Sequence, residues 1–121
     1  MPVVYTSASL ALATLEILVH VGRDDLPGDL IAIKIFVPDD LPRRTLTAAR
    51  LPPDWNRYRA PKALADLGDA WAASGRTALL VVPTAIVPES ENILINPAHR
   101  DAARIRVLRR TAFSWDRRLR R

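Results

Sequence analysis

The sequence predicts a single layer-packed domain of mixed structure, of the α/β or α+β class. Segments with the apolar period of a helix alternate with short segments rich in β-branched residues, which are typical of strands. The chain of 121 residues is long enough for one hydrophobic core. It contains no internal repeat, low-complexity tract or linker that would divide it.

The first helix is predicted to follow a short strand. Residues 3–6 are mostly β-branched or aromatic, which favours a strand. Ser7 or Ser9 can then cap a helix over residues 9–21, since a serine hydroxyl accepts from the free N–H groups of a first turn. Gly22 can end this helix. The helix is apolar almost all round, so we expect it to be buried.

The middle of the chain is expected to hold another strand and another helix. Residues 30–37 are apolar on both faces, which predicts an interior strand. Residues 38–60 are rich in proline and arginine, which indicates irregular structure. In residues 62–74, a stripe of leucine and tryptophan at spacings of three and four predicts an amphipathic helix, which Ser74-Gly75 would end.

The last third of the chain alternates short apolar segments with turn signals. Strands are predicted over residues 78–82, 92–95 and 105–112. Residues 96–103 begin with Asn-Pro, a favourable cap followed by a favourable first position, and therefore predict a short helix. These segments continue the mixture of helices and strands that is expected for one domain.

The composition excludes several classes of protein. The chain has no cysteine, hence no disulfide and no thiolate metal site, which is consistent with a reducing cytoplasm. No segment reaches the roughly 20 apolar residues of a transmembrane helix, and Glu16 interrupts the apolar N-terminus, which argues against a signal peptide. With two histidines and no cysteine, a metal site is not expected. Gly-rich phosphate loops and nucleophile elbows are absent.

The chain is basic, with a formal net charge of +5. Many of its cations are arginines of the last 18 residues: Arg104, Arg106, Arg109, Arg110, Arg117, Arg118, Arg120 and Arg121. Such a cluster can bind phosphates or an acidic partner, although a solvated edge strand and tail is the more common explanation. A nucleic-acid-binding module is disfavoured, because the basic motif interleaved with aromatic residues that is typical of one is not recognisable.

Glu16 is the most informative single residue. It lies in the middle of an apolar helix, with Ile17 beside it and Leu12 one turn before it. Burying a carboxylate there without a partner would cost free energy. Glu16 is therefore either a functional group that faces a cleft or a structural one paired with His20, four residues further on.

Two other side chains are weaker candidates for a site. Tyr5 ends the first strand, where it could face the helix that follows, although a tyrosine is more often part of a core. Thr84 follows a strand, and its hydroxyl could contact a ligand or bond a local backbone group. The remaining conspicuous residues are interpreted as structural: Trp55, Trp71 and His99.

Six segments, taken together and in order, resemble the RES domain family. They are residues 2–7 (PVVYTS), 11–20 (ALATLEILVH), 51–55 (LPPDW), 67–71 (LGDAW), 82–88 (VPTAIVP) and 91–99 (ENILINPAH). Each motif is unspecific alone. Their order and spacing match the family from residue 2 to about residue 119.

The resemblance implies an α+β fold similar to that of ADP-ribosyltransferases, with a mixed β-sheet core and short flanking helices. Members of the family are toxins of bacterial type II toxin–antitoxin systems. They degrade NAD by breaking its nicotinamide–ribose bond, with water or phosphate as acceptor. We therefore expect a cytoplasmic toxin with NAD as substrate, no cofactor and an Xre-type antitoxin as partner. A homodimer is compatible with the resemblance, whereas binding to membranes or directly to DNA is not expected.

The resemblance also implies which residues form the site. Glu16 matches the family glutamate, Tyr5 matches a tyrosine of the NAD pocket, and Thr84 takes the place of the family serine, so these three are the expected catalytic residues. The methyl group that Thr84 adds would narrow the space for a ligand. The expected substrate-binding residues are Tyr5, Thr6, Ser7, Thr84 and Asn92.

The family arginine normally precedes the tyrosine and would lie before Met1. We therefore expect the domain, residues 1–121, to be truncated at its N-terminus relative to the family. Position alone suggests Arg23, Arg57 and Arg59 as substitutes for this arginine. Two alternative functions stay open: a non-catalytic remnant that still binds its antitoxin, and an ADP-ribosyltransferase that acts on a protein target.

Overall fold

The computed structural model describes residues 2–57 and 62–120. Its strands are β1 (Val4–Ser7), β2 (Ile31–Phe36), β3 (Arg43–Thr45), β4 (Leu79–Pro83), β5 (Glu91–Ile95) and β6 (Arg106–Ala112). The α-helices are α1 (Leu10–Val21) and α2 (Lys62–Ser74), and short 3₁₀ turns are η1 (Arg23–Asp25), η2 (Ala48–Arg50), η3 (Arg100–Arg104) and η4 (Arg117–Leu119). The expected α+β class is confirmed.

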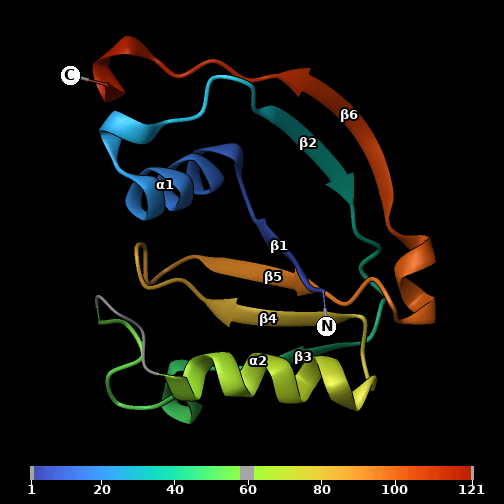
Figure 1. The fold of residues 1–121 in the computed structure, drawn as a ribbon. Coiled ribbons are helices and arrows are strands. Elements are labelled where there is room, and N and C mark those ends of the chain that lie inside the picture. The colour runs from blue at the N-terminus through green and yellow to red at the C-terminus, as the bar shows by residue number, and fades with distance from the viewer. Residues whose placement is uncertain (1, 58–61, 121) are drawn as a thin grey trace.

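The strands form two separate sheets. Four of them make a mixed sheet in the order β1-β5-β4-β3, in which only the β3–β4 pair is parallel. The other two, β2 and β6, pair as an antiparallel ribbon. In Figure 1, α2 covers one side of the four-stranded sheet, the ribbon lies on the other side, and α1 lies near the end where β4 leaves the sheet.

The core is built on the two faces of the four-stranded sheet. On the α2 side, Trp71 and Ala72 of the helix pack against Leu80 and Leu94 of the strands. The interpretation of Trp71 as a core residue is confirmed, because the side chain is almost completely buried. On the other face a second cluster, formed by Leu41, Ala78, Leu79 and Ile95, meets the end of the ribbon.

Two predictions of burial were wrong. Helix α1 was expected to be buried, but only Leu12 is, while Leu10 and Val19 are more than half exposed. The helix packs mainly on β1 at the edge of the sheet and on η1, and half of its residues are exposed. Residues 30–37 were expected to form an interior strand, yet among the described strands β2 pairs only with β6, and its Ile33 is 56% exposed.

Two other segments differ from the prediction in type. Residues 38–60 were expected to be irregular, but they contain β3, whose Arg43 donates to the carbonyls of Leu41 and Pro38. The helix expected from residue 96 begins only at residue 100 and is a 3₁₀ helix. Instead of capping it, Asn96 accepts from the N–H of Ala98 in a turn.

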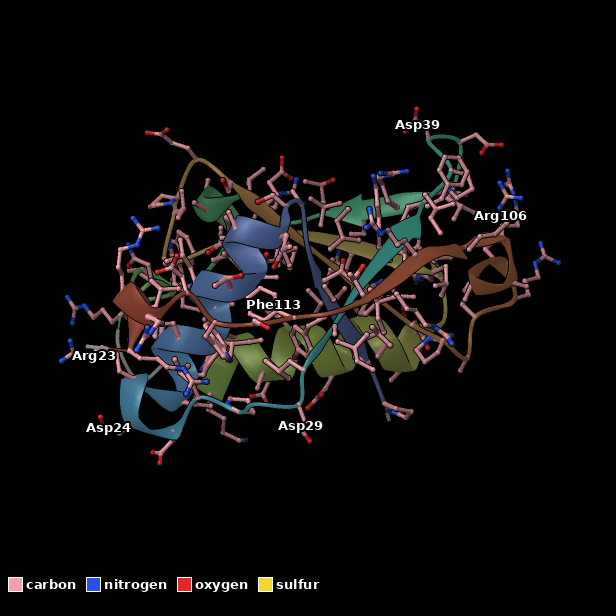
Figure 2. All side chains as sticks on the ribbon, turned by 90° about the horizontal axis from the view of Figure 1, so that it is seen from above. Arg23, Asp24, Asp29, Asp39, Arg106 and Phe113 are labelled. Atoms are coloured by element: carbon pink, nitrogen blue, oxygen red, sulfur yellow. The ribbon has the colours of Figure 1, made fainter. Side chains whose placement is uncertain are left out.

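Seen from above (Figure 2), the ribbon crosses the molecule, with Arg106 at one end of β6 and Phe113 just beyond the other. Every residue of β6 is exposed. Phe36 of β2 lies under the guanidinium of Arg106, with 5.7 Å between the guanidinium carbon and the ring centroid. The expectation of an exposed basic edge strand is thereby confirmed. None of the described helices is long and apolar enough to cross a membrane.

Candidate functional site

The carboxylate of Glu16 is held by two side chains that are distant in sequence. Thr84 Oγ1 donates a hydrogen bond to Glu16 Oε1 at 3.0 Å, and Asn92 Nδ2 donates to the same oxygen at 2.9 Å. The three residues come from α1, the end of β4 and β5. Two donors on one oxygen fix the orientation of the carboxylate and leave Oε2 for other partners.

Each of these side chains is positioned by its own element. Helix α1 begins at Ser9, whose hydroxyl accepts from the N–H of Leu12, and ends at Gly22, whose φ of 76° suits glycine. Strand β4 is an interior strand that ends at Pro83, so Thr84 lies just beyond its C-terminal end. Asn92 lies beside this end, because β5 pairs with β4 in the register Val82↔Asn92.

Thr84 makes the local backbone contacts that the sequence allowed, and it also bonds Glu16, while its contact with a ligand stays a prediction. Its hydroxyl donates to Glu16, and its oxygen accepts from the N–H groups of Ile86 and Val87 at 3.2 and 3.5 Å. The side chain is only 2% exposed. The local backbone contacts therefore orient the hydroxyl that holds Glu16.

His20 lies next to the second oxygen of Glu16. The distance from His20 Nε2 to Glu16 Oε2 is 3.9 Å, so the pairing predicted from their spacing is present as a long contact. The side chain of His20 is 76% exposed, whereas that of Glu16 is 23% exposed. The carboxylate is thus partly open to solvent on the side of His20.

A cavity of about 400 Å³ opens in front of these groups, within the size range of small-molecule sites. Residues of α1, β1, β4, β5, α2 and the segment between β3 and α2 line it. Its polar or aromatic lining consists of Tyr5, Glu16, His20, Trp55, Asp69 and Asn92, and most other lining residues are apolar. The site can therefore hold a partly aromatic ligand against a carboxylate.

The predicted site residues are only partly brought together at this cavity. Tyr5, which is 76% exposed, and Asn92 line the cavity with Glu16, and Thr84 reaches it through Glu16. Ser7 is the cross-strand partner of Asn92 and does not line the cavity. Thr6 does not line it either, because its hydroxyl donates to the carbonyl of Ile93 at 2.7 Å.

Among the polar and aromatic lining residues, Trp55 and Asp69 had no functional role in the sequence interpretation. Trp55 was interpreted as structural, and Asp69 was noticed only as part of the LGDAW motif. That motif was the available signal, since Asp69 lies two residues before the buried Trp71, on the same helix.

The suggested substitutes for the family arginine do not line the cavity where they can be placed. Arg23 and Arg57 are not among the lining residues, and Arg59 lies outside the described residues. Among the lining residues that the structure describes, there is no lysine or arginine. Among all residues that the structure describes, no group of three or more histidines and carboxylates is arranged to hold a metal ion.

Comparison with known proteins confirms the family resemblance. The model of the RES domain family matches residues 1–116. The chain is 40% identical over 119 residues to a Prs ADP-ribosylating toxin of Sphingobium sp. (strain YBL2), covering 97% of this chain and 74% of the relative. It is 37% identical over 119 residues to a Toxin Res of Photorhabdus laumondii, covering 98% of this chain and 76% of the relative.

Proposed function

The chain belongs to the RES domain family, and we propose on that premise that it is a toxin that degrades NAD by breaking the nicotinamide–ribose bond. The relatives described above are themselves named as toxins. The observation that carries the proposal is the oriented carboxylate of Glu16 at a cavity with aromatic lining.

The chemistry needs a carboxylate in this position. Breaking the bond between ribose and the nicotinamide nitrogen develops positive charge on the ribose, as in glycoside hydrolysis. Glu16 would stabilise this charge through Oε2, since Oε1 is already bonded to Thr84 and Asn92. Nicotinamide leaves with the electrons of the broken bond, and the ribose carbon bonds to phosphate or to a water molecule that releases a proton to the solvent. Tyr5 at the cavity wall would contact the nicotinamide ring.

The remaining expected roles belong to the same proposal. Thr84 and Asn92 would hold the carboxylate and keep their expected role in substrate binding, whereas Thr6 and Ser7, which do not line the cavity, are expected to support β1. NAD is the substrate, and no cofactor is required. We propose an Xre-type antitoxin as the partner and the cytoplasm as the place of action.

The first test is the NAD content of cells after induced expression of residues 1–121, beside Glu16→Gln. Glutamine keeps the shape of the side chain and removes its charge. We expect NAD to fall with the parent chain and the rate of loss to drop by about 100-fold or more in Glu16→Gln. Equal NAD loss in both strains, with both proteins folded, would contradict the role of Glu16.

A second candidate function is transfer of ADP-ribose to a protein. The name of the Sphingobium relative, an ADP-ribosylating toxin, favours it. The same bond breaks, but a protein side chain then takes the ribose carbon in place of water. Purified chain incubated with NAD separates the two functions: hydrolysis releases free ADP-ribose without any other protein, whereas transfer requires an added protein that becomes labelled.

A further inference from the structure

Gly68 lies in the middle of helix α2, where glycine has no local structural reason to be. A glycine inside a helix is less stable than an alanine, because it gives the unfolded chain more conformational freedom. Such a glycine is usually required by a positive φ angle or by the close approach of another element. The positive φ angles of the described glycines occur at Gly22 and Gly75, and a Cβ atom on Gly68 would have nothing that the structure describes within 4 Å. Neither reason applies to Gly68.

The open space at Gly68 lies on the side of α2 that faces the four-stranded sheet. Gly68 precedes Trp71 by three residues and Ala72 by four, and residues at these spacings share one face of a helix. Both of those side chains are buried against the strands. One turn earlier, the same face meets the cavity of about 400 Å³, of which Gly68 is a lining residue. The cavity therefore continues the core at the point where α2 carries no side chain.

The other walls of the cavity are mostly apolar. Strands β4 and β5 contribute leucine and valine, and the segment between β3 and α2 contributes two leucines and a tryptophan: Leu80, Val82, Leu94, Leu46, Leu51 and Trp55. Protein interiors are close-packed, so an apolar hollow beside a core lowers the stability of the fold unless a ligand fills it. Such a hollow holds a flat apolar group better than it holds water, which needs polar partners.

We propose that Gly68 is a specificity-determining residue that keeps this cavity open for a planar aromatic ring of the substrate. The bare backbone of the helix lets the ring approach closely, and Trp55 supplies an aromatic surface on the cavity wall. The identity of the ring rests on the proposed function, because NAD carries two rings of this class, adenine and nicotinamide.

Ala70 provides a matched control on the same helix. It follows Gly68 by two residues, which places it on nearly the opposite face, and it is exposed and does not line the cavity. Gly68→Leu would fill the cavity with a side chain, whereas Ala70→Leu would place the same side chain in solvent. Gly68→Ala is a smaller version of the first change, since it adds only a methyl group.

Thermal melting tests whether the space at Gly68 is open. We expect Gly68→Ala to raise the melting temperature by about 2–5 °C, because its methyl group meets no neighbour and alanine favours a helix. Gly68→Leu should melt at least as high as the wild-type chain. If leucine prevents folding, Gly68→Ala alone is used for the binding test. A lower melting temperature in Gly68→Ala would show that the space is occupied and would overturn the inference.

Calorimetric titration with nicotinamide and with adenosine tests whether a ring uses this space. We expect Gly68→Leu to weaken the binding of one or both ligands by about tenfold or more, because the new side chain takes the place of the ring. Gly68→Ala should weaken the same ligand less, and Ala70→Leu should change neither affinity. The ligand that is affected identifies the ring.

Three results of the titration would overturn the inference: unchanged affinities in the folded Gly68 variants, an equal loss in Ala70→Leu, or no binding of either ligand to the folded wild-type chain. NAD turnover, measured on the same samples, separates this inference from the proposed function. Turnover with unchanged ring binding in Gly68→Leu would leave NAD degradation standing and remove the role of Gly68. Ring binding that depends on Gly68, without turnover in the wild-type chain, would do the reverse.

Discussion

At Glu16, the sequence left open whether the carboxylate faced a cleft or paired with His20, and the structure contains both arrangements. Oε1 is bonded by Thr84 and Asn92, whereas Oε2 is 3.9 Å from His20 at the rim of the cavity. An intrusive carboxylate in an apolar helix was therefore a useful signal of a site. Its two donors could not be found from local pattern, because they lie 68 and 76 residues further along the chain.

Thr84 gives a prediction at the same scale. Thr84→Ser keeps the hydroxyl and removes a methyl group, so we expect NAD degradation at least as fast as in the parent chain. Thr84→Val keeps the shape and removes the donor to Glu16, so we expect a rate about tenfold lower. Initial rates of NAD loss with purified proteins check both. Equal rates in the valine and serine variants would show that the hydroxyl does not matter.

Local sequence signals predicted where most helices and strands lie better than they predicted how deeply those elements are buried. The bounds of both α-helices and the positions of β1, β4, β5 and β6 agree closely with the sequence prediction. Strand β3 was missed because Arg-Arg-Thr carries no apolar alternation, so its parallel pairing with β4 has no signal in the local pattern. An apolar pattern also does not determine how many other elements pack against a helix or strand. The exposure of α1 and β2 was therefore not predicted.

The helix that carries Glu16 depends on its cap. Ser9 accepts from the N–H of Leu12 at 3.1 Å, so Ser9→Ala should lower the free energy of unfolding by about 1 kcal/mol. Thr14→Ala is the control, since its exposed hydroxyl only bonds back to the carbonyl of Leu10 and alanine favours a helix. Urea denaturation measures both. A loss as large in Thr14→Ala as in Ser9→Ala would contradict the capping role.

A second contact between elements gives a pH prediction. Arg104 of η3 donates to both carboxylate oxygens of Asp40, and this hydrogen bonding lowers the pKa of Asp40 below its usual 3.8. Because the folded pKa is the lower one, the stabilisation is present above pH 3.8 and disappears as the pH falls through the lowered value.

We therefore expect Asp40→Asn to melt slightly below the parent chain at pH 7, with the difference vanishing as the pH falls through the lowered pKa. Both side chains are half or more exposed, so added salt should also shrink the difference at pH 7. Thermal melts of both proteins at pH 7 and at a pH below the lowered pKa of Asp40, each at two salt concentrations, check this. A difference that persists in acid would assign the effect to something other than the ion pair.

Over the whole molecule, burial concentrates in the four-stranded sheet and leaves the ribbon outside. The two core clusters lie on the faces of that sheet, and only the end of β2 near Ile35 packs against one of them. The β2–β6 ribbon instead presents exposed isoleucine and valine beside the arginines of β6. The sequence predicted one core, but it could not divide similar apolar strands between the two environments, because both β2 and β4 carry apolar residues on their two faces.

The difference in burial between the four-stranded sheet and the β2–β6 ribbon can be measured with two substitutions that remove a similar number of atoms. Leu79 of β4 is 0% exposed, so Leu79→Ala should cost about 2–5 kcal/mol in free energy of unfolding, since it leaves a cavity between the sheet and its cover. Ile33 of β2 is 56% exposed, so Ile33→Ala should cost about 1 kcal/mol or less. If the two losses measured by urea denaturation were equal, the ribbon would have to be covered in solution, and the loss at Ile33 should then depend on protein concentration.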